Sequence, residues 1–288
     1  MKKTYLLYAG ISIFFWSTLA TISKLLLGSM SSYQLLCGGS LFAALALLIV
    51  NIATGKIKLL KSYRIKDYAA TLFACLPGTF FYYVFFYLGT ERIPASQAFI
   101  INYLWPMMSV FFAFLVLGEK LTARKCIAFA LSFLGVITVA GKDILSFNSS
   151  TLTGVLFCVL AAISYGAFTA LNQKQEYDDR VSMMIAFFAT FIMSAVISII
   201  IGDSFPLGVW EILGVAWNGI FILALATLTW AVALKKGGTA RVSSLAYITP
   251  FLSLVWTFFI LKDPINPLSV IGLAIIILGI FIQRKDTK

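Results

Sequence analysis

The chain has 288 residues, of which 61% are hydrophobic and only 11% are charged. A soluble domain of this size would need many more charged side chains to cover its surface, so the composition excludes an ordinary soluble protein. The formal net charge of +11 is compatible with nucleic-acid binding, but the distribution of the basic residues argues against it. We therefore expect a lipid bilayer, and no nucleic acid, as the partner of this chain.

Apolar runs of membrane-spanning length follow one another along the whole sequence. A spanning helix needs about 20 apolar residues, because each residue adds about 1.5 Å and the hydrocarbon layer is about 30 Å thick. The sequence therefore predicts an all-α membrane protein with ten transmembrane helices and no soluble domain. We interpret the first run as a retained span, because it lacks a clear signal-peptide cleavage site. The predicted spans are 6–27, 33–53, 68–88, 96–117, 123–140, 153–173, 182–201, 211–234, 241–261 and 267–283.

The basic residues divide unequally between the two sides of these predicted spans. With a cytoplasmic N-terminus, all but four of the 22 Lys and Arg residues lie in cytoplasmic segments. Such an excess is typical of cytoplasmic loops. The sequence thus predicts a multi-pass protein of the plasma membrane with both termini in the cytoplasm. The four exceptions are Lys24, Arg92, Lys142 and Lys262.

Residues that would carry out catalysis or bind a metal are sparse. The chain has no histidine, and its four cysteines lie within or at the ends of spans without a CxxC pair. This predicts neither a zinc site nor a disulfide framework. The sequence also lacks a GxSxG motif and paired carboxylates. We therefore expect no metal, no cofactor and no enzymatic activity.

The second half of the sequence repeats features of the first at an offset of 144 residues. Tyr103 and Pro106 correspond to Tyr247 and Pro250, and the same offset pairs Gly135 with Gly279. Two repeats of five helices are therefore predicted, over 1–145 and 146–288. Five is odd, so the second repeat enters the membrane from the opposite side. Inverted repeats are typical of transporters that alternate between two open states around a site near the midplane, although a duplication without a mechanical role is the alternative.

Ten helices in two inverted repeats resemble the drug/metabolite transporter superfamily, in its EamA-type branch. The resemblance covers essentially the whole chain and includes four short segments in their expected order. These are Phe15-Trp16-Ser17, Leu117-Gly118-Glu119, Ala162-Ile163-Ser164-Tyr165 and Ala233-Leu234-Lys235.

The segment from Asn102 to Pro106, together with Tyr82 and Tyr83, resembles the aromatic amino-acid exporters of that branch. In those exporters, aromatic side chains of the third and fourth spans line a central, largely apolar cavity. The resemblance thus implicates Tyr82, Tyr83, Phe86, Tyr103 and Trp105. This chain has Tyr83 where the subgroup can carry a histidine, so the resemblance does not fix the substrate.

Depth in the membrane separates candidate site aromatics from interfacial ones. Trp16 lies ten residues into the first predicted span, which is about 15 Å deep at about 1.5 Å per residue. A tyrosine hydroxyl at such depth needs a partner or a wet cavity, although helix packing could also account for these rings. Trp210, Trp217, Trp230 and Trp256 lie nearer span ends and are expected mainly at the interfaces. The predicted cavity is lined by Trp16, Tyr82, Tyr83, Phe86, Tyr103, Trp105, Tyr165 and Tyr247.

Polar groups and helix breaks complete the predicted site. Asn102 and Ser164 are the polar side chains that we expect to face the solute, with helix–helix hydrogen bonding as the alternative. Pro77, Pro106 and Pro250 interrupt the third, fourth and ninth predicted spans. Each proline removes a helical hydrogen bond and frees a carbonyl, which predicts either a shaped cavity or a static kink.

All 11 acidic residues fall in loops or at span ends. A carboxylate inside a span is energetically costly and is found there when it has a function, such as the exchange of protons for substrate. Because the spans contain no such carboxylate, we predict transport down the solute's own gradient. The scarcity of Lys and Arg inside the spans argues against organophosphate substrates. The sequence favours an exporter of aromatic or large apolar amino acids over an exporter of other metabolites or drugs, a channel or an intramembrane enzyme. It leaves the oligomeric state open.

Overall fold

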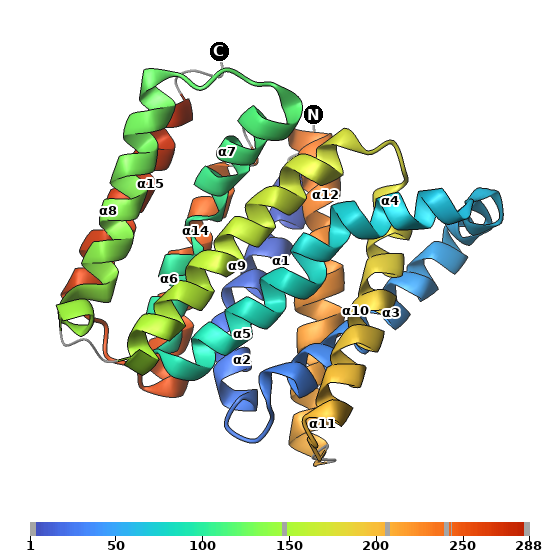
Figure 1. The fold of residues 1–288 in the computed structure, drawn as a ribbon, viewed down its shortest axis with the longest axis horizontal. Coiled ribbons are helices and arrows are strands. Elements are labelled where there is room, and N and C mark those ends of the chain that lie inside the picture. The colour runs from blue at the N-terminus through green and yellow to red at the C-terminus, as the bar shows by residue number, and fades with distance from the viewer. Residues whose placement is uncertain (1–3, 146–148, 205–207, 239–241, 243, 285–288) are drawn as a thin grey trace. The chain divides into compact units, whose positions relative to one another are not determined.

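The computed structural model describes residues 4–145, 149–204, 208–238, 242 and 244–284, and over these residues the chain is helical and without strands (Figure 1). Within the described part of the chain, eight helices are long and apolar enough to cross a membrane, and two shorter apolar helices, Leu245–Leu261 and Pro267–Ile282, follow them. The all-α, membrane-spanning character is thereby confirmed, while the count of ten spans stays a prediction. The eight long helices are Thr4–Leu26, Ser32–Ala53, Ile65–Arg92, Ala95–Leu117, Ala123–Ala140, Ser149–Lys174, Asp179–Ile200 and Val209–Gly237.

The chain divides into two compact units, each of which takes segments from both halves of the sequence. Unit 1 comprises Met1–Phe73 and Tyr177–Trp256, and unit 2 comprises Ala74–Glu176 and Thr257–Lys288. The compact units are thus a different division of the chain from the two predicted sequence repeats. Those repeats, 1–145 and 146–288, stay a prediction.

In unit 1, α3 lies along α10 (Figure 1) and also packs against η3, while α1 packs against α12 and α14. Small residues allow the approach of α3 to η3: a Cβ atom added to Gly219 would lie 2.3 Å from the carbonyl oxygen of Gly39. The elements are α1 (Thr4–Ser17), α2 (Leu19–Leu26), α3 (Ser32–Ala53), η1 (Lys56–Ser62), α10 (Asp179–Ile200), α11 (Val209–Ala216), η3 (Trp217–Leu225), α12 (Ala226–Gly237), η4 (Ser244–Tyr247) and α14 (Ile248–Trp256), with α4 (Ile65–Leu76) ending in unit 2.

In unit 2, α9 packs against η2, α5, α6 and α7, and α8 lies along α15 (Figure 1). Glycines again allow the close pairing, since a Cβ atom on Gly135 would lie 2.7 Å from the carbonyl oxygen of Gly272. Such small residues at helix contacts are typical of membrane proteins. The elements are η2 (Pro77–Phe81), α5 (Tyr82–Arg92), α6 (Ala95–Asn102), α7 (Trp105–Leu117), α8 (Ala123–Leu145), α9 (Ser149–Lys174), η5 (Thr257–Leu261) and α15 (Pro267–Arg284).

The packing inside the two units is related by the offset of 144 residues. Adding 144 to the residue numbers of α1, α5 and α7 gives the regions of α9, α12 and α14. In unit 1, α1 packs against α12 and α14; in unit 2, α9 packs against α5 and α7. These helix pairs therefore correspond between the units with the two sequence halves exchanged, whereas the pair of α3 with α10 belongs to unit 1 and the pair of α8 with α15 to unit 2.

Irregular backbone occurs at each proline that the sequence singles out. The π-helix η2 begins at Pro77, and its repeat-related region falls within another π-helix, η3. The chain leaves the helical pattern between Asn102 and Trp105, one residue before Pro106. At the repeat-related position, the 3-10 helix η4 ends at Tyr247 and α14 carries Pro250 in its first turn. π-segments of this kind are frequent at functional sites.

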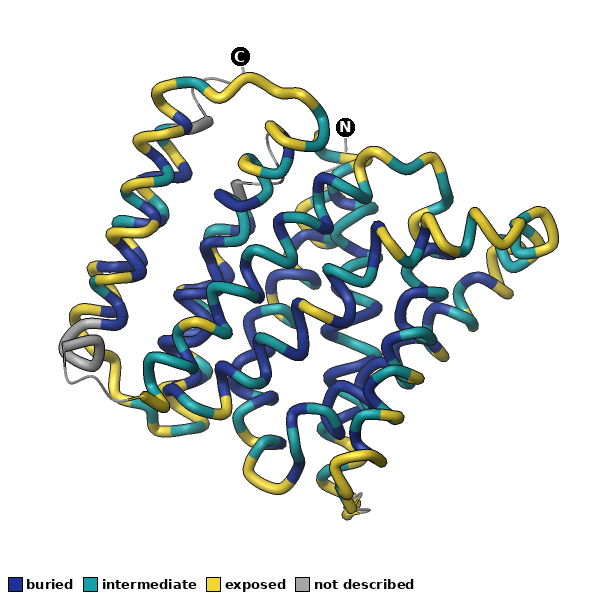
Figure 2. The backbone as a smooth tube through the Cα atoms, in the orientation of Figure 1, coloured by how far each residue is buried: buried dark blue, intermediate teal, exposed yellow. Residues whose placement is uncertain are grey.

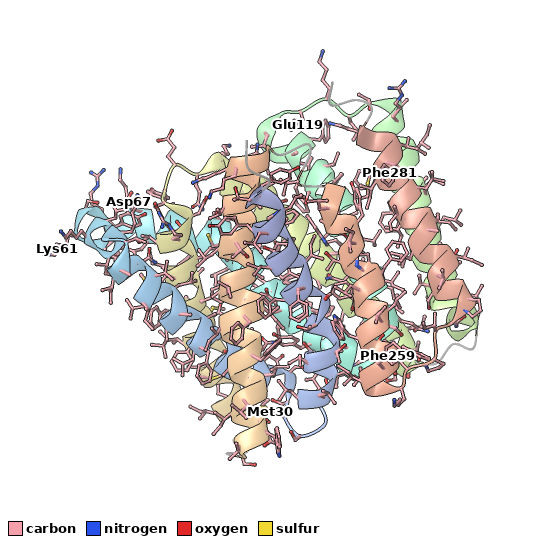
Figure 3. The ribbon with its side chains drawn as sticks, turned by 180° about the vertical axis from the view of Figure 1, so that it is seen from behind. Met30, Lys61, Asp67, Glu119, Phe259 and Phe281 are labelled. Carbon is pink, nitrogen blue, oxygen red and sulfur yellow. The ribbon has the colours of Figure 1, made fainter. Side chains whose placement is uncertain are left out.

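Burial follows the expectation for helices in lipid. Along α8 and α15, buried positions alternate with exposed ones (Figure 2). The exposed positions include large apolar residues such as Ile137 and Phe281, which are 58% and 48% exposed, and Phe281 is labelled in Figure 3. Figure 3 also shows that Lys61 and Asp67 lie at the opposite end of unit 1 from Met30. Exposed apolar side chains of this kind are favourable in the hydrocarbon layer. A helix can lie there because it satisfies its own backbone hydrogen bonds.

Candidate functional site

Three rings from three different helices meet in unit 2. The ring of Tyr165, on α9, lies 4.8 Å from that of Tyr82 on α5 and 5.1 Å from that of Trp105 on α7, between ring centroids. The tilted and edge-to-face arrangements are those that aromatic rings prefer. Tyr165 is therefore the centre of what we call the unit 2 ring cluster, which consists of Tyr82, Tyr83, Phe86, Tyr103, Trp105 and Tyr165.

The remaining members join this centre by further ring contacts. Tyr83 and Phe86 lie 4.6 Å and 6.1 Å from Tyr82, and Tyr103 lies 6.3 Å from Trp105. Tyr82, Tyr83, Phe86 and Tyr103 are buried, whereas Trp105 and Tyr165 are half-buried. The structure thus brings together six of the sequence-predicted aromatics within one compact unit.

Asn102 connects the helix break to the ring cluster. Its side-chain Nδ2 donates a hydrogen bond of 2.9 Å to the hydroxyl of Tyr82. The residue is only 3% exposed, and its amide oxygen Oδ1 has no hydrogen-bond partner among the described residues. A buried amide usually satisfies both ends, so a ligand or water that donates to Oδ1 would complete it. Ser164 is half-buried beside Tyr165 on α9.

Two glycines bring the backbones close enough for these contacts. A Cβ atom on Gly166 of α9 would lie 2.4 Å from the Cβ of Met108 on α7. A Cβ atom on Gly78 of η2 would lie 2.3 Å from the ring of Phe168, also on α9. Phe168 in turn lies 5.5 Å from Tyr165. The sequence analysis missed Phe168, although its place three residues after Tyr165 puts it on the same helix face.

Two predicted site residues lie in unit 1. Trp16 on α1 packs its ring 5.3 Å from that of Trp230 on α12, and Tyr247 is half-buried at the end of η4. The offset of 144 residues pairs Trp230, which was expected at the interface, with Phe86, and this pairing is a signal in the sequence that could have grouped Trp230 with Trp16. A single cavity that joins Trp16 and Tyr247 to the unit 2 ring cluster stays a prediction.

The other tryptophans of unit 1 differ from one another. Trp210 is 82% exposed, which fits an interfacial position. The indole N–H groups of Trp217 and Trp256 instead donate to the hydroxyls of Thr18 and Ser17, at 3.2 Å and 2.9 Å. Trp217 and Trp256 are therefore hydrogen-bonded to the first span. Their positions within their own predicted spans did not indicate these contacts.

The unit 2 ring cluster offers stacking faces and tyrosine hydroxyls, and the amide of Asn102 lies beside it. None of these side chains carries a charge at neutral pH. Among the residues that the structure describes, no group of three or more His, Cys, Asp and Glu side chains is placed to hold a metal ion. Such an arrangement is suited to reversible binding of an amphipathic solute.

A comparison with the sequence profiles of known families assigns this chain to one family. The profile of the EamA-like transporter family matches residues 3–141 and 152–283. The chain belongs to the EamA-like transporter family. Membership makes it a multi-pass membrane transporter of the drug/metabolite transporter superfamily and carries the expectation that it is not an enzyme.

Curated transporters are similar to this chain at low identity. An uncharacterized transporter of Clostridium kluyveri is 25% identical over 100% of this chain and 95% of its own length. The aromatic amino acid exporter YddG of Ancylobacter novellus is 25% identical over 61% of this chain and 62% of its own length. A solved crystal structure matches 98% of this chain and 97% of its own with a TM-score of 0.69 and 21% identity, which shows a shared fold.

Proposed function

We propose that this EamA-family transporter exports small amphipathic metabolites, and that aromatic and large apolar amino acids are its main substrates. The observation that carries the proposal is the ring cluster around Tyr165, with the unsatisfied amide oxygen of Asn102 beside it. The relative from Ancylobacter novellus, which is named as an aromatic amino acid exporter, supports the same substrate class.

The apolar end of such a substrate fits the rings. A side chain that stacks on one of them gains about 0.5–1.5 kcal/mol per aromatic pair beyond the burial of its area. Trp105 and Tyr165 are half-buried, so their faces are the accessible part of the ring cluster. The resulting affinity is modest, which suits a protein that must release what it binds.

The zwitterionic end of the substrate interacts with helix dipoles rather than with fixed charges, at the break between α6 and α7. The α6 helix ends at Asn102, and α7 begins at Trp105. The C-terminal end of a helix attracts cations, and the N-terminal end attracts anions. The substrate ammonium is then bound at Oδ1 of Asn102 and the end of α6, and its carboxylate at the start of α7. Discontinuous helices serve amino-acid binding in this way in other transporters.

Alternating access follows from the inverted repeat. The packing of α1 against α12 and α14 corresponds to that of α9 against α5 and α7, with the sequence halves exchanged, which supports two interconvertible arrangements of one architecture. The solute gradient drives the exchange, because the ring cluster has no carboxylate or histidine to carry protons. The distribution of basic residues supports cytoplasmic termini and a plasma-membrane location.

Counterflow in proteoliposomes tests the proposal. Vesicles loaded with unlabelled phenylalanine should accumulate external labelled phenylalanine, and vesicles loaded with glutamate should not. Accumulation with other metabolites or drugs but not with aromatic amino acids would show a different substrate class within the superfamily. Passive equilibration without counterflow would show a channel, because only a carrier couples inward and outward steps.

A further inference from the structure

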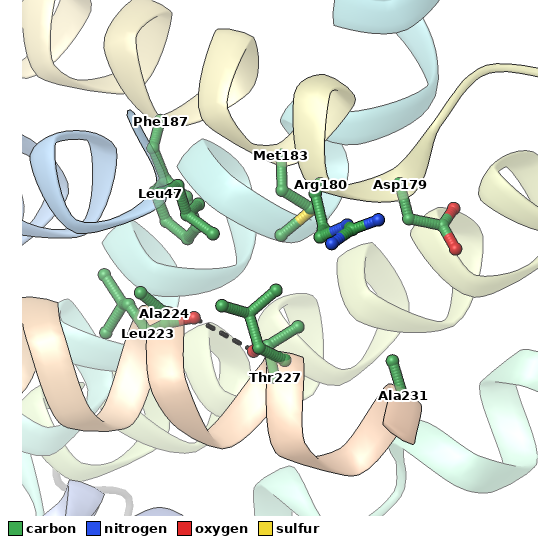
Figure 4. A pocket seen from close by; sticks show the side chains of 10 residues that line it. Leu47, Asp179, Arg180, Met183, Phe187, Leu223, Ala224, Thr227 and Ala231 are labelled. Carbon is green, nitrogen blue, oxygen red and sulfur yellow. Dashed lines mark hydrogen bonds between the residues drawn. The ribbon is translucent and has the colours of Figure 1, made fainter. Parts of the chain in front are cut away.

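Cavities within unit 1 differ in size. The groove between α10 and α12 (Figure 4) has only about 50 Å³ of free space between side chains such as Leu47 and Phe187, which is room for a few waters. A pocket of about 420 Å³ lies between α2 and α11. Small-molecule sites have volumes of about 300–1,000 Å³, so this second pocket, which we call the α2–α11 pocket, is large enough for a compact ligand.

The walls of the α2–α11 pocket are mainly apolar. Ile22, Leu25 and Leu26 come from α2, and Leu213 comes from α11. Gly214 lets the two helices approach closely, because a Cβ atom on this residue would lie 2.7 Å from Cδ2 of Leu26. The apolar body of a ligand would therefore be enclosed by side chains of both helices.

One wall of the pocket is an aromatic ring in a fixed orientation. Trp217 lines the pocket, and its indole N–H donates to the hydroxyl of Thr18 at 3.2 Å. Its ring lies 5.0 Å from that of Phe221 and 5.4 Å from that of Phe15, between centroids. Because the indole nitrogen is already paired, Trp217 offers a ligand its π surface. Such a surface attracts both aromatic rings and cations.

Glu211 gives the pocket its charge. Among the described residues that line the pocket, it is the only charged one. Ser29 is also polar, but its hydroxyl donates to the carbonyl oxygen of Leu26 at 3.4 Å. Glu211 lies in the first turn of α11, and its Oε2 occupies the space that a side chain on Gly208 would need. The carboxylate thus lies at the start of its own helix, where negative charge is favoured, and it attracts a cation into the pocket.

We propose that the α2–α11 pocket binds small apolar amines, for which phenethylamine is the model ligand. The ring of the amine packs on Trp217 and the leucines, and its ammonium donates to the carboxylate of Glu211. A phospholipid fits less well, because its phosphate would face Glu211 without a basic residue in the pocket. An amino acid fits less well for the same reason, since its own carboxylate is left without a partner. The pocket is therefore a second site, with a charge preference that the uncharged ring cluster lacks.

Isothermal titration calorimetry of the full-length protein in a neutral detergent tests the proposal. The three ligands share a phenyl ring and differ in charge: phenethylamine, phenethyl alcohol and hydrocinnamate. Phenethylamine should bind most tightly and hydrocinnamate most weakly. Glu211→Gln should weaken phenethylamine binding roughly tenfold through loss of a charge-assisted contact, and should leave phenethyl alcohol unaffected. Equal affinities of the unmodified protein for the amine and the alcohol would overturn the proposal.

Three further variants locate the binding. Glu91→Gln is the matched control and should bind phenethylamine normally, because this carboxylate is paired with Arg92 at 2.9 Å and does not line the pocket. Ser29→Phe should fill the pocket and weaken the binding of the amine and the alcohol alike. Equal losses in Glu211→Gln and Glu91→Gln would overturn the proposal, as would unchanged binding in Ser29→Phe. Binding that is lost in Trp105→Ala and kept in Glu211→Gln would also overturn it, since the amine would then occupy the ring cluster.

Discussion

Tyr82→Phe removes a single hydroxyl from the ring cluster. In the structure that hydroxyl accepts the 2.9 Å hydrogen bond from Nδ2 of Asn102, and both residues are buried. Its loss leaves the amide of Asn102 without this acceptor. A buried unsatisfied donor costs about 1–3 kcal/mol, and hydrogen bonds between membrane helices average about 0.6 kcal/mol. We expect a loss of about 1 kcal/mol in stability, with the ring contacts of Tyr82 retained.

A double-mutant cycle separates the hydrogen bond from substrate binding. Thermal unfolding of purified Tyr82→Phe, Asn102→Leu and the double variant should show non-additive losses, because the second change removes the amide that the first leaves unpaired. In counterflow assays, Asn102→Leu should raise the KM for phenylalanine, since it deletes Oδ1. Tyr82→Phe keeps Oδ1 and should change KM by less than about fivefold, which corresponds to about 1 kcal/mol.

Either of two results would refute this reasoning. Strictly additive stability losses would mean that the bond between Asn102 and Tyr82 does not form. An unchanged KM in Asn102→Leu, at normal expression, would mean that the amide oxygen does not take part in substrate binding.

Three other predictions concern packing, energy coupling and pH. Gly166→Ala should destabilise the protein by about 1–3 kcal/mol in thermal unfolding, because its Cβ would lie 2.4 Å from that of Met108; an unchanged Tm contradicts the close approach of α7 and α9. Export should proceed without substrate-driven proton flux in sealed vesicles, and a one-to-one proton signal would refute a gradient-driven carrier. Burial acts to raise the pKa of Asp178, but its hydrogen bond and ion pair with Lys56 outweigh this and hold the pKa below its usual value. The stability advantage over Asp178→Asn should therefore be present above the unfolded-state pKa of about 3.9 and disappear as the pH falls through the lower folded-state pKa; an advantage that grows in acid contradicts the ion pair.

Local signals in the sequence accounted for the helices and for three of their interruptions, but not for the π-helices η3 and η5, which contain no proline. Runs of apolar residues are long enough to define spans, and Pro77, Pro106 and Pro250 coincide with irregular backbone because proline removes a helical donor wherever it stands. Trp105 and Tyr165 could be selected because deep aromatic side chains are unusual away from the interfaces, whereas Tyr82 was selected through the resemblance to the aromatic amino-acid exporters.

Tertiary contacts decided what the sequence could not show. Depth alone placed Trp217 and Trp256 at the interface, yet both donate to hydroxyls of the first span. The ring of Phe168 lies next to the ring cluster because Gly78, which has no side chain, leaves room for it. The division into units that mix both sequence halves depends on pairings between distant helices, and these leave no periodic trace along the chain.

Counterflow of labelled tryptophan by the unmodified protein, Trp105→Ala and Trp210→Ala tests the central claim most directly. Trp105 contacts Tyr165 in the ring cluster at 5.1 Å, whereas Trp210 is 82% exposed. The account predicts that the unmodified protein and Trp210→Ala accumulate label, and that Trp105→Ala does so far more slowly at equal expression. Equal impairment of the two variants, or no counterflow of tryptophan by the unmodified protein, would contradict the assignment of the ring cluster as the substrate site.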